Sequence, residues 1–464
     1  MTPIAVAATH HLTDSPGRVS AVNLPSRWLA ILDVALLACG LWVVACSPLV
    51  IVGDAESRYR SLEELMLNGK MDNTSYSLLG PALAAPLWKL GETPEERREL
   101  VSYFNLGVFA IAAFALFFSL RRHIGAERTR RFLLLLLFGT AFPHELQNFN
   151  NEVLSSLALG AGLLGLLSLK GWPRVLGSTF VVLGTANMPG LAIGSGLSVL
   201  QLVQFSKRLR FLLVPLLCAG AVCLEAWLRR GSAFTSGYEG NAGFKTALPY
   251  SGLPGFSYPF ALGALSILFS FGKGLLFFYP GLFLPAWRWL KAHTPEARAL
   301  HRAWLLVVFG LLLVYSRWWS WYGGFCWGPR FFLFAGLPAC LAMALWSRQA
   351  RSMLSALAAC TIIAWALWVG YAGLVFSLSN LDICAAKNYR LESFCWYVPE
   401  FSVLIRPFVV TRELVEWEAN ALTLFVIVYL RITLNLWLSV ITEAVQQVIG
   451  APPRVLAWIR GFHV

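Results

Sequence analysis

The chain contains 464 residues, of which 57% are hydrophobic and 13% are charged, and its mean hydropathy is +0.63. This balance lies far from that of soluble globular proteins, and the many apolar runs separated by short polar segments predict an all-α, polytopic membrane protein. The formal net charge of +13 does not indicate a nucleic-acid partner, because Lys and Arg gather in alternate polar segments, as the positive-inside rule expects of cytoplasmic loops.

The chain begins with a polar segment, residues 1–28, that lacks the apolar core of a cleavable signal peptide, so we expect a short cytoplasmic tail. The first apolar run, residues 29–52, is expected to cross the membrane and to end outside. Residues 53–99 then form a long first outer loop, which we expect to be catalytic. Within it, residues 61–67 have amphipathic helical spacing and residues 76–90 are apolar but interrupted by prolines, so both segments are expected to lie in the membrane interface.

We expect about twelve spans in one integral membrane domain, residues 1–464, with both termini inside. The arginine-rich segment 121–131 is the clearest marker of the inner side, and residues 379–420 form the last outer loop. Arg431 lies within the last expected span and needs a partner or a polar cavity there. The expected helices after the first lie at about residues 100–120, 132–142, 153–169, 175–205 (a hairpin of two short helices), 211–227, from 268 onward, 303–316, 331–346, 354–378 and 421–442.

Two carboxylates lie directly after the first expected span. Asp54 and Glu56 are two residues apart, and Arg58 and Tyr59 follow them. An interfacial loop whose charges meet water would also explain this stretch. Because the span ends at a fixed depth, however, these side chains are expected at the outer membrane surface, where a site for a membrane-bound substrate would lie.

A second acidic stretch, residues 144–152, lies between two expected helices on the same side. It holds His144, two carboxylates and four amides, and Glu152 occupies the first turn of the following helix. Solvation alone would account for a polar loop. The combination nevertheless suits a site that positions a hydroxyl or a cation, with Glu152 close to Asp54.

Lys273 lies between two glycines where an outer helix is expected to begin. A lysine in this position suits a phosphate, because the free N–H groups and the dipole of a helix N-terminus add to its charge. A lysine whose ammonium group reaches the outer membrane interface is an equally good explanation.

An aromatic stretch, residues 317–330, contains four Trp and one Tyr and ends at Arg330. An interfacial aromatic belt is the usual explanation for such residues. A belt does not require the paired glycines 323–324 or the Gly-Pro pair 328–329, which shape the backbone and let ligands approach closely. We therefore interpret the stretch as a binding site. Its aromatic faces suit a sugar ring or an isoprenoid tail, and the planar guanidinium of Arg330 suits bidentate hydrogen bonding to a phosphate.

The nine cysteines show no CxxC or metal-ligand spacing. Cys384 and Cys395 share the last expected outer loop, where they either form a disulfide or remain two free thiols.

Taken in order, these stretches resemble the polytopic glycosyltransferases of the GT-C class, in particular bacterial members related to protein O-mannosyltransferases and aminoarabinose transferases. The resemblance implies transfer of a sugar from a polyprenyl phosphate to a glycan, lipid or protein acceptor on the outer face of the plasma (inner) membrane. It also implies direct displacement with inversion, without a covalent sugar intermediate. One departure is Glu152, where many relatives have Asp. The resemblance is carried by GDAE (53–56), Glu152, FGKGL (271–275) and WYGGFCWGPR (321–330).

The resemblance also implies a division of roles. A departing lipid phosphate needs cations near its developing charge, and Arg330, Lys273 and Arg58 are the candidates. Asp54 is the expected general base for the acceptor hydroxyl. Glu152, with Glu56, is expected to orient the acceptor or to hold a divalent cation, Mg²⁺ or Mn²⁺. The expected substrate contacts are Glu56, Tyr59, His144, Trp321, Tyr322 and Trp327, and no dedicated set of metal ligands is predicted.

Two other classes of membrane protein share this topology. A flippase for lipid-linked sugars or a secondary transporter would also be polytopic and basic inside, and a non-catalytic scaffold would leave the acidic loops incidental. Transporters usually place ionisable residues near the bilayer midplane, often in paired halves. In this chain the carboxylates cluster in expected outer loops without a convincing internal repeat, which favours the transferase.

Overall fold

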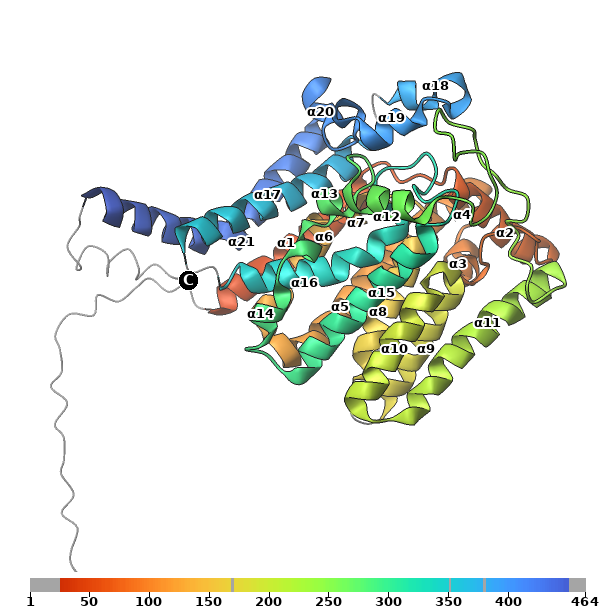
Figure 1. The fold of residues 1–464 in the computed structure, drawn as a ribbon, viewed down its shortest axis with the longest axis horizontal. Coiled ribbons are helices and arrows are strands. Elements are labelled where there is room, and N and C mark those ends of the chain that lie inside the picture. Colours follow the sequence, from red (N-terminus) through yellow and green to blue (C-terminus); the bar gives the residue numbers. More distant parts are fainter. Residues whose placement is uncertain (1–25, 168–170, 350–351, 379–380, 450–464) are drawn as a thin grey trace, which may run out of the picture.

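The computed structural model describes residues 26–167, 171–349, 352–378 and 381–449. Most of the predicted cytoplasmic tail, residues 1–25, lies outside the described residues, as do residues 379–380 of the predicted last outer loop. The described chain is a bundle of helices (Figure 1), and within it no strand is formed beyond one isolated bridge between Val50 and Asn148. The all-α, multi-pass class predicted from the sequence is confirmed.

The α-helices are α1 (Ser26–Cys46), α2 (Asp54–Asn68), α3 (Leu79–Leu90), α4 (Pro94–Ser102), α5 (Phe104–Ile124), α6 (Ala126–Phe138), α7 (Phe142–Leu146), α8 (Asn151–Leu166), α9 (Trp172–Asn187), α10 (Ala192–Ser206), α11 (Leu213–Arg230), α12 (Phe260–Phe269), α13 (Leu275–Phe278), α14 (Ala286–Leu290), α15 (Pro295–Tyr315), α16 (Gly336–Trp346), α17 (Met353–Val375), α18 (Asp382–Tyr389), α19 (Glu392–Tyr397), α20 (Arg406–Val409) and α21 (Glu416–Ile449). Short 3₁₀ helices are η1 (Pro189–Leu191), η2 (Leu209–Leu212), η3 (Pro280–Phe283), η4 (Arg330–Ala335) and η5 (Pro399–Phe401).

Six helical segments among the described residues are long and apolar enough to cross a membrane, or seven if the bent pair α9–α10 counts as one span. Three shorter apolar segments, α8, α12 and η4–α16, add to the bundle. The expected number of about twelve spans is therefore not confirmed. The predicted hairpin of two short helices corresponds to α9 and α10, and the chain bends by 120° between them. Pro189 explains the bend, because proline lacks the N–H that a continuous helix needs and disfavours helical geometry at the residue before it.

The predicted helix beginning at residues 268–275 is wrong. The chain forms a turn at residues 271–273, followed only by the short elements α13, η3 and α14. Prolines at 280 and 285 interrupt the apolar pattern. Gly272 lies against the carbonyl of Cys395, where a Cβ atom would collide, and its N–H donates to the carbonyl of Trp396 at 3.0 Å. The turn is thus held by Cys395 and Trp396 of α19.

Both segments predicted within the expected first outer loop are helical: α2 is longer than the predicted segment 61–67, and α3 is shorter than the predicted segment 76–90. Gly53 has a φ of 61°, which a glycine adopts without strain, and α2 begins directly after it at Asp54. Asp54 and Arg58 are therefore one helical turn apart on one face of α2. Tyr59, on another face, packs with Trp88 of α3 and Phe149 in a small second core that fixes α2.

Two contacts bring the second acidic stretch beside the first loop. The N–H of Val50 donates to the carbonyl of Gln147 at 2.8 Å. The side-chain amide of Asn105 in α5 donates to the carbonyls of Asn148 (2.7 Å) and Asn150 (2.9 Å). These bonds place the start of α8 next to the start of α2.

Arg431 has the partner that the sequence requires. Its guanidinium forms an ion pair at 2.8 Å with Asp33 of α1, which is fully buried and also pairs with Arg130 of α6 at 2.8 Å. The ion pairs tie α1, α6 and α21 together.

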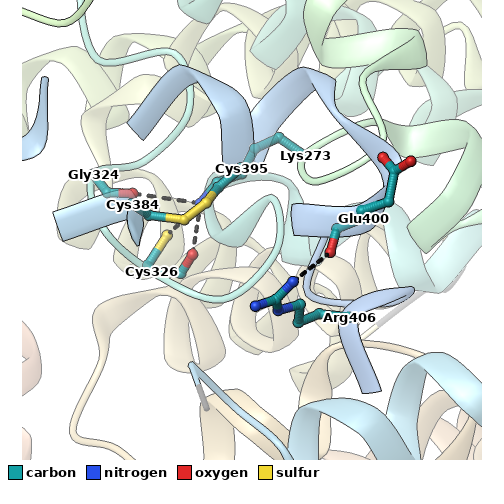
Figure 2. The surroundings of a disulfide bond; sticks show 7 residues. All are labelled: Lys273, Gly324, Cys326, Cys384, Cys395, Glu400 and Arg406. Carbon is teal, nitrogen blue, oxygen red and sulfur yellow. Dashed lines mark hydrogen bonds between the residues drawn. A yellow bond between two sulfur atoms is a disulfide. The ribbon is translucent and has the colours of Figure 1, made fainter. Parts of the chain in front are cut away.

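Cys384 and Cys395 are joined by a disulfide. Figure 2 shows that this bond lies beside Lys273 and the loop of Gly324 and Cys326. The disulfide links α18 to α19 within the predicted last outer loop.

Candidate active site

Three residues far apart in the sequence form an ion cluster at the candidate active site. Arg330, the first residue of η4, pairs through Nη2 with Asp54 Oδ2, and its Nε lies 3.6 Å from Glu152 Oε1. The side chains of Arg330 and Glu152 are 13% and 4% exposed. The structure therefore brings together the expected general base, the second carboxylate and the expected phosphate-binding arginine.

Tyr76 completes the surroundings of Asp54. Its hydroxyl donates a hydrogen bond of 2.7 Å to Asp54 Oδ1, so both carboxylate oxygens have a partner. The guanidinium of Arg58 lies over the Tyr76 ring at 4.7 Å and donates to Asn150 Oδ1 at 3.3 Å. Arg58 thus lies at the site, as expected, and links it to the second acidic stretch.

The pKa of Asp54 is lowered from its ordinary value of 3.8. Burial acts in the opposite direction, but the charges of Arg330 and Arg58, together with hydrogen bonds from Tyr76 and Arg330, more than offset it. Asp54 is therefore ionised at neutral pH.

Two cavities meet at this cluster. The first has a volume of about 520 Å³ and is lined by Asp54, Arg330, Glu145 and Gln147, among others. Its lining is rich in amides and charged groups.

The second cavity, of about 480 Å³, is lined at one end by Arg58, Tyr76 and Glu152. Apolar side chains, including Ile193 and Val222, line part of the remainder, together with polar side chains such as Asn187 and Glu225. The ion cluster therefore lies between two cavities of mixed lining, of which the second has the larger apolar share.

Glu145 is a site residue that the sequence reasoning did not single out. It is 1% exposed, lines the first cavity and accepts a hydrogen bond of 2.8 Å from the side-chain amide of Asn150. Burial raises its pKa, and the nearby charge of Glu152 adds to the effect. Its place in the polar stretch 144–152 was the available signal.

His144 and Trp327 both line the first cavity, as substrate contacts should. Their ring centroids are 5.2 Å apart. His144 donates from Nδ1 to the carbonyl of Gly373 at 3.2 Å, and burial lowers its pKa to about 4. The imidazole is therefore neutral at physiological pH.

Lys273 does not line either cavity, so the geometry does not support its predicted contact with phosphate. Lys273 is 5% exposed, and its ammonium group donates to the carbonyls of Cys326 (2.7 Å) and Gly324 (3.4 Å), as Figure 2 shows. It also donates to the carbonyl of Gly328 at 3.1 Å. These bonds hold the loop that leads to Trp327 and Arg330, so Lys273 stabilises the site without lining its cavities.

Four other predicted substrate contacts line neither cavity. Glu56 points to Arg60 and Arg98, with which it forms ion pairs, and Tyr59 lies in the small core beneath α2. Trp321 and Tyr322 pack on Trp396 of α19, with ring centroids 5.3 Å and 4.0 Å apart. Sequence proximity to the site therefore does not place these side chains in it.

In the described part of the chain, no group of three or more His, Cys, Asp or Glu side chains converges. Asp54 and Glu152, the predicted candidates for holding a divalent cation, both face Arg330.

Comparisons with known proteins bear on the fold. No protein-family model matches the sequence, and no curated protein sequence matches it. The crystal structure of ArnT from Cupriavidus metallidurans bound to undecaprenyl phosphate matches with a TM-score of 0.50 at 13% identity, over 94% of this chain and 76% of that chain.

Two further solved structures match less well. The archaeal oligosaccharyltransferase AglB from Archaeoglobus fulgidus, in complex with an inhibitory peptide and a dolichol-phosphate, gives a TM-score of 0.47 at 14% identity over 74% of this chain and 55% of that chain. The arabinosyltransferase EmbB from Mycobacterium smegmatis gives a TM-score of 0.42 at 16% identity, over 96% of this chain and 41% of that chain. On the ArnT match, the chain has the fold of a GT-C membrane protein, as its four sequence stretches predict.

Proposed function

We propose that this protein is a membrane glycosyltransferase that moves a sugar from a polyprenyl phosphate to an acceptor hydroxyl on the outer face of the plasma membrane. The observation that carries the proposal is the cluster of Asp54, Arg330 and Glu152 between two cavities, of which the second has the larger apolar share. The fold shared with ArnT, whose structure holds undecaprenyl phosphate, supports the class of donor.

The donor lipid occupies the second cavity in this proposal. Its isoprenoid chain needs an apolar wall, which the helices around Ile193 and Val222 provide, and its phosphate needs arginine. Arg58 lines that cavity and Arg330 lies in the wall between the two cavities. The phosphate therefore binds Arg58, and Arg330 lies beside the anomeric carbon of the sugar.

The acceptor enters the first cavity, where amide and carboxylate groups suit hydroxyl-bearing molecules. Its oxygen forms a bond to the anomeric carbon while the bond from that carbon to the phosphate oxygen breaks. The electron pair of the broken bond stays on the phosphate, where the two arginines stabilise the charge. Attack from the side opposite the phosphate inverts the anomeric centre.

Asp54 takes the proton of the acceptor hydroxyl. Each of its oxygens keeps a second lone pair beside the bond to Arg330 or Tyr76. Because its pKa is low, Asp54 is a weak base, and it takes the proton late, after the attacking oxygen has gained positive charge. Glu152 holds Arg330 in place from the other side.

The experiment that tests donor binding is thermal stabilisation of the purified protein by a polyprenyl phosphate and by polyprenyl-phosphate sugars. We expect the unfolding temperature to rise in the wild type, and the rise to be lost in Arg58→Ala and Arg330→Lys. Arg60→Ala is the matched control, because Arg60 is an exposed arginine of the same helix that pairs with Glu56. No stabilisation of the wild type, or stabilisation retained in both site variants, would overturn the proposal.

A further inference from the structure

The segment between α2 and α3 carries Tyr76 but has little backbone support of its own. None of the backbone N–H groups of residues 71–77, all of which the structure describes, donates to a backbone carbonyl. Its conformation must therefore be held by side chains from elsewhere.

Arg229, at the C-terminal end of α11, holds this segment. Its side chain is 1% exposed. Nε donates to the carbonyl of Asp72 at 2.9 Å and Nη2 donates to the hydroxyl of Thr74 at 2.9 Å. The same guanidinium also donates to the carbonyl of Tyr76 and to the carboxylate of Asp72. One buried side chain thus contacts three alternate residues of the segment.

Two neighbours on α11 complete the attachment. Arg230 donates to the carbonyl of Thr74 at 2.8 Å. Glu225 accepts from the N–H of Leu78 at 3.2 Å and pairs with Arg229 at 2.6 Å. The segment is therefore fastened to the end of α11 along most of its length.

The same helix lines the second cavity. Val222, Glu225 and Arg230 of α11 belong to its wall, as does Tyr76. Any displacement of the end of α11 would therefore change both the cavity and the position of the tyrosine that contacts Asp54.

We propose that Arg229 is a positioning residue: by fixing the backbone of residues 72–76 it holds the Tyr76 hydroxyl on Asp54 and so keeps the carboxylate oriented toward the first cavity. The attachment itself is independent of the enzymatic role, whereas its catalytic consequence rests on the proposed function of Asp54.

The attachment is tested without any activity assay, by limited trypsin digestion at Lys70, an exposed residue at the start of the segment. Cleavage requires the chain around the bond to open locally. We expect Arg229→Ala to be cut about tenfold faster than the wild type, and Arg229→Lys to be intermediate because a lysine makes fewer of these bonds. Arg60→Ala, which removes an exposed ion pair of α2, should be cut at the wild-type rate. Equal rates for wild type and Arg229→Ala would overturn the attachment.

The catalytic consequence is tested by the dependence of the transfer rate on pH. Asp54 must be ionised to act, so activity falls as the pH drops through its pKa. The Tyr76 hydrogen bond lowers that pKa, and its loss should move this acid limb to higher pH. We expect the same shift in Tyr76→Phe and in Arg229→Ala, with kcat reduced and the KM for the donor little changed.

The double variant distinguishes positioning from a general structural effect. If Arg229 acts through Tyr76, the Arg229→Ala/Tyr76→Phe variant shows no further shift of the acid limb. If Arg229 had only a structural role, Arg229→Ala would reduce the amount of active protein without moving the acid limb of the pH profile, and this result would overturn the proposal. Shifts of the two single variants that add up in the double variant would overturn it as well. If the wild type transfers no sugar, the proposed function fails while the proteolysis result still decides the attachment. Should Arg229→Ala fail to fold, Arg229→Lys serves in both tests.

Discussion

Asp54 and Arg330 lie 276 positions apart in the sequence and form an ion pair at the meeting point of two cavities. Asp54 begins α2, which follows α1 after residues 47–53, and Arg330 begins η4 after the aromatic loop. The pair therefore connects the acidic segment that follows the first span with the cationic end of the aromatic stretch. In the proposed reaction, one member takes a proton and the other stabilises the departing phosphate.

The first prediction concerns the general base. Asp54→Asn keeps the size of the side chain but removes the base, so the transfer rate should fall by about 10²- to 10⁴-fold. The protein should still fold, and the binding of the donor lipid should stay close to that of the wild type.

Glu56→Gln is the matched control for that variant. It makes the same chemical change two residues further along α2, on a side chain that pairs with Arg60 and Arg98 outside both cavities. The transfer rate should remain within about twofold of the wild type, because a surface ion pair contributes little. Equal losses in Asp54→Asn and Glu56→Gln would show that the acidic loop matters as a whole and that Asp54 has no special role.

The second prediction concerns the buried charges. Arg330→Met leaves the carboxylate of Glu152 buried without its partner, which typically costs about 3–5 kcal/mol of stability. Glu152→Gln in the same chain removes the unpaired charge and should recover part of the loss. Unfolding in denaturant measures both variants, and a double variant no more stable than Arg330→Met would contradict the pairing.

The third prediction concerns the dependence of stability on pH. Burial, and then the charge of Glu152, raise the pKa of Glu145 above its ordinary value of 4.5. A carboxyl with a raised pKa stabilises the fold fully below its unfolded pKa, and this contribution is lost as the pH rises through the folded pKa.

Glu145→Gln should therefore lose less thermal stability than the wild type when the pH is raised from about 5 to about 8. Thermal unfolding at a series of pH values measures the slope of the unfolding temperature against pH. Glu92→Gln, which changes an exposed carboxyl, is the control. A slope unchanged by Glu145→Gln would show that this carboxyl does not titrate over that range.

The fourth prediction concerns the disulfide between α18 and α19. The disulfide between Cys384 and Cys395 closes a loop with a sequence separation of 11 residues, for which the loss of chain entropy corresponds to about 3 kcal/mol. Cys384→Ser/Cys395→Ser should be less stable by that order, and a reducing agent should destabilise the wild type but leave the variant unchanged. Equal stability of the two proteins under oxidising conditions would contradict this account.

The sequence predicted the central residues of the candidate site because their positions follow from simple rules. Asp54 and Glu152 each lie near the end of an apolar helix, and the distribution of Lys and Arg predicts that those ends lie on one side of the membrane. Arg330 follows a loop shaped by glycines on that same side. Residues at corresponding depths of neighbouring helices are brought together once the bundle packs.

Other features depend on contacts that no local pattern encodes. Tyr76 lies in an irregular segment, and its position depends on Arg229, 153 residues away. Lys273 was expected at the start of a helix, but Gly272 packs against Cys395 and the chain turns there. Trp321 and Tyr322 were expected to face a ligand, yet Trp396 covers them. In each case a distant segment decides which way the side chain points.

The most direct test of the central claim uses the purified protein in proteoliposomes with polyprenyl-phosphate sugars labelled in the sugar, and a membrane extract as the source of acceptors. We predict that label appears on an acceptor while free polyprenyl phosphate is released, and that neither occurs with Asp54→Asn. Movement of the intact lipid-linked sugar across the bilayer, without cleavage of the sugar–phosphate bond, would contradict the transferase and identify a flippase.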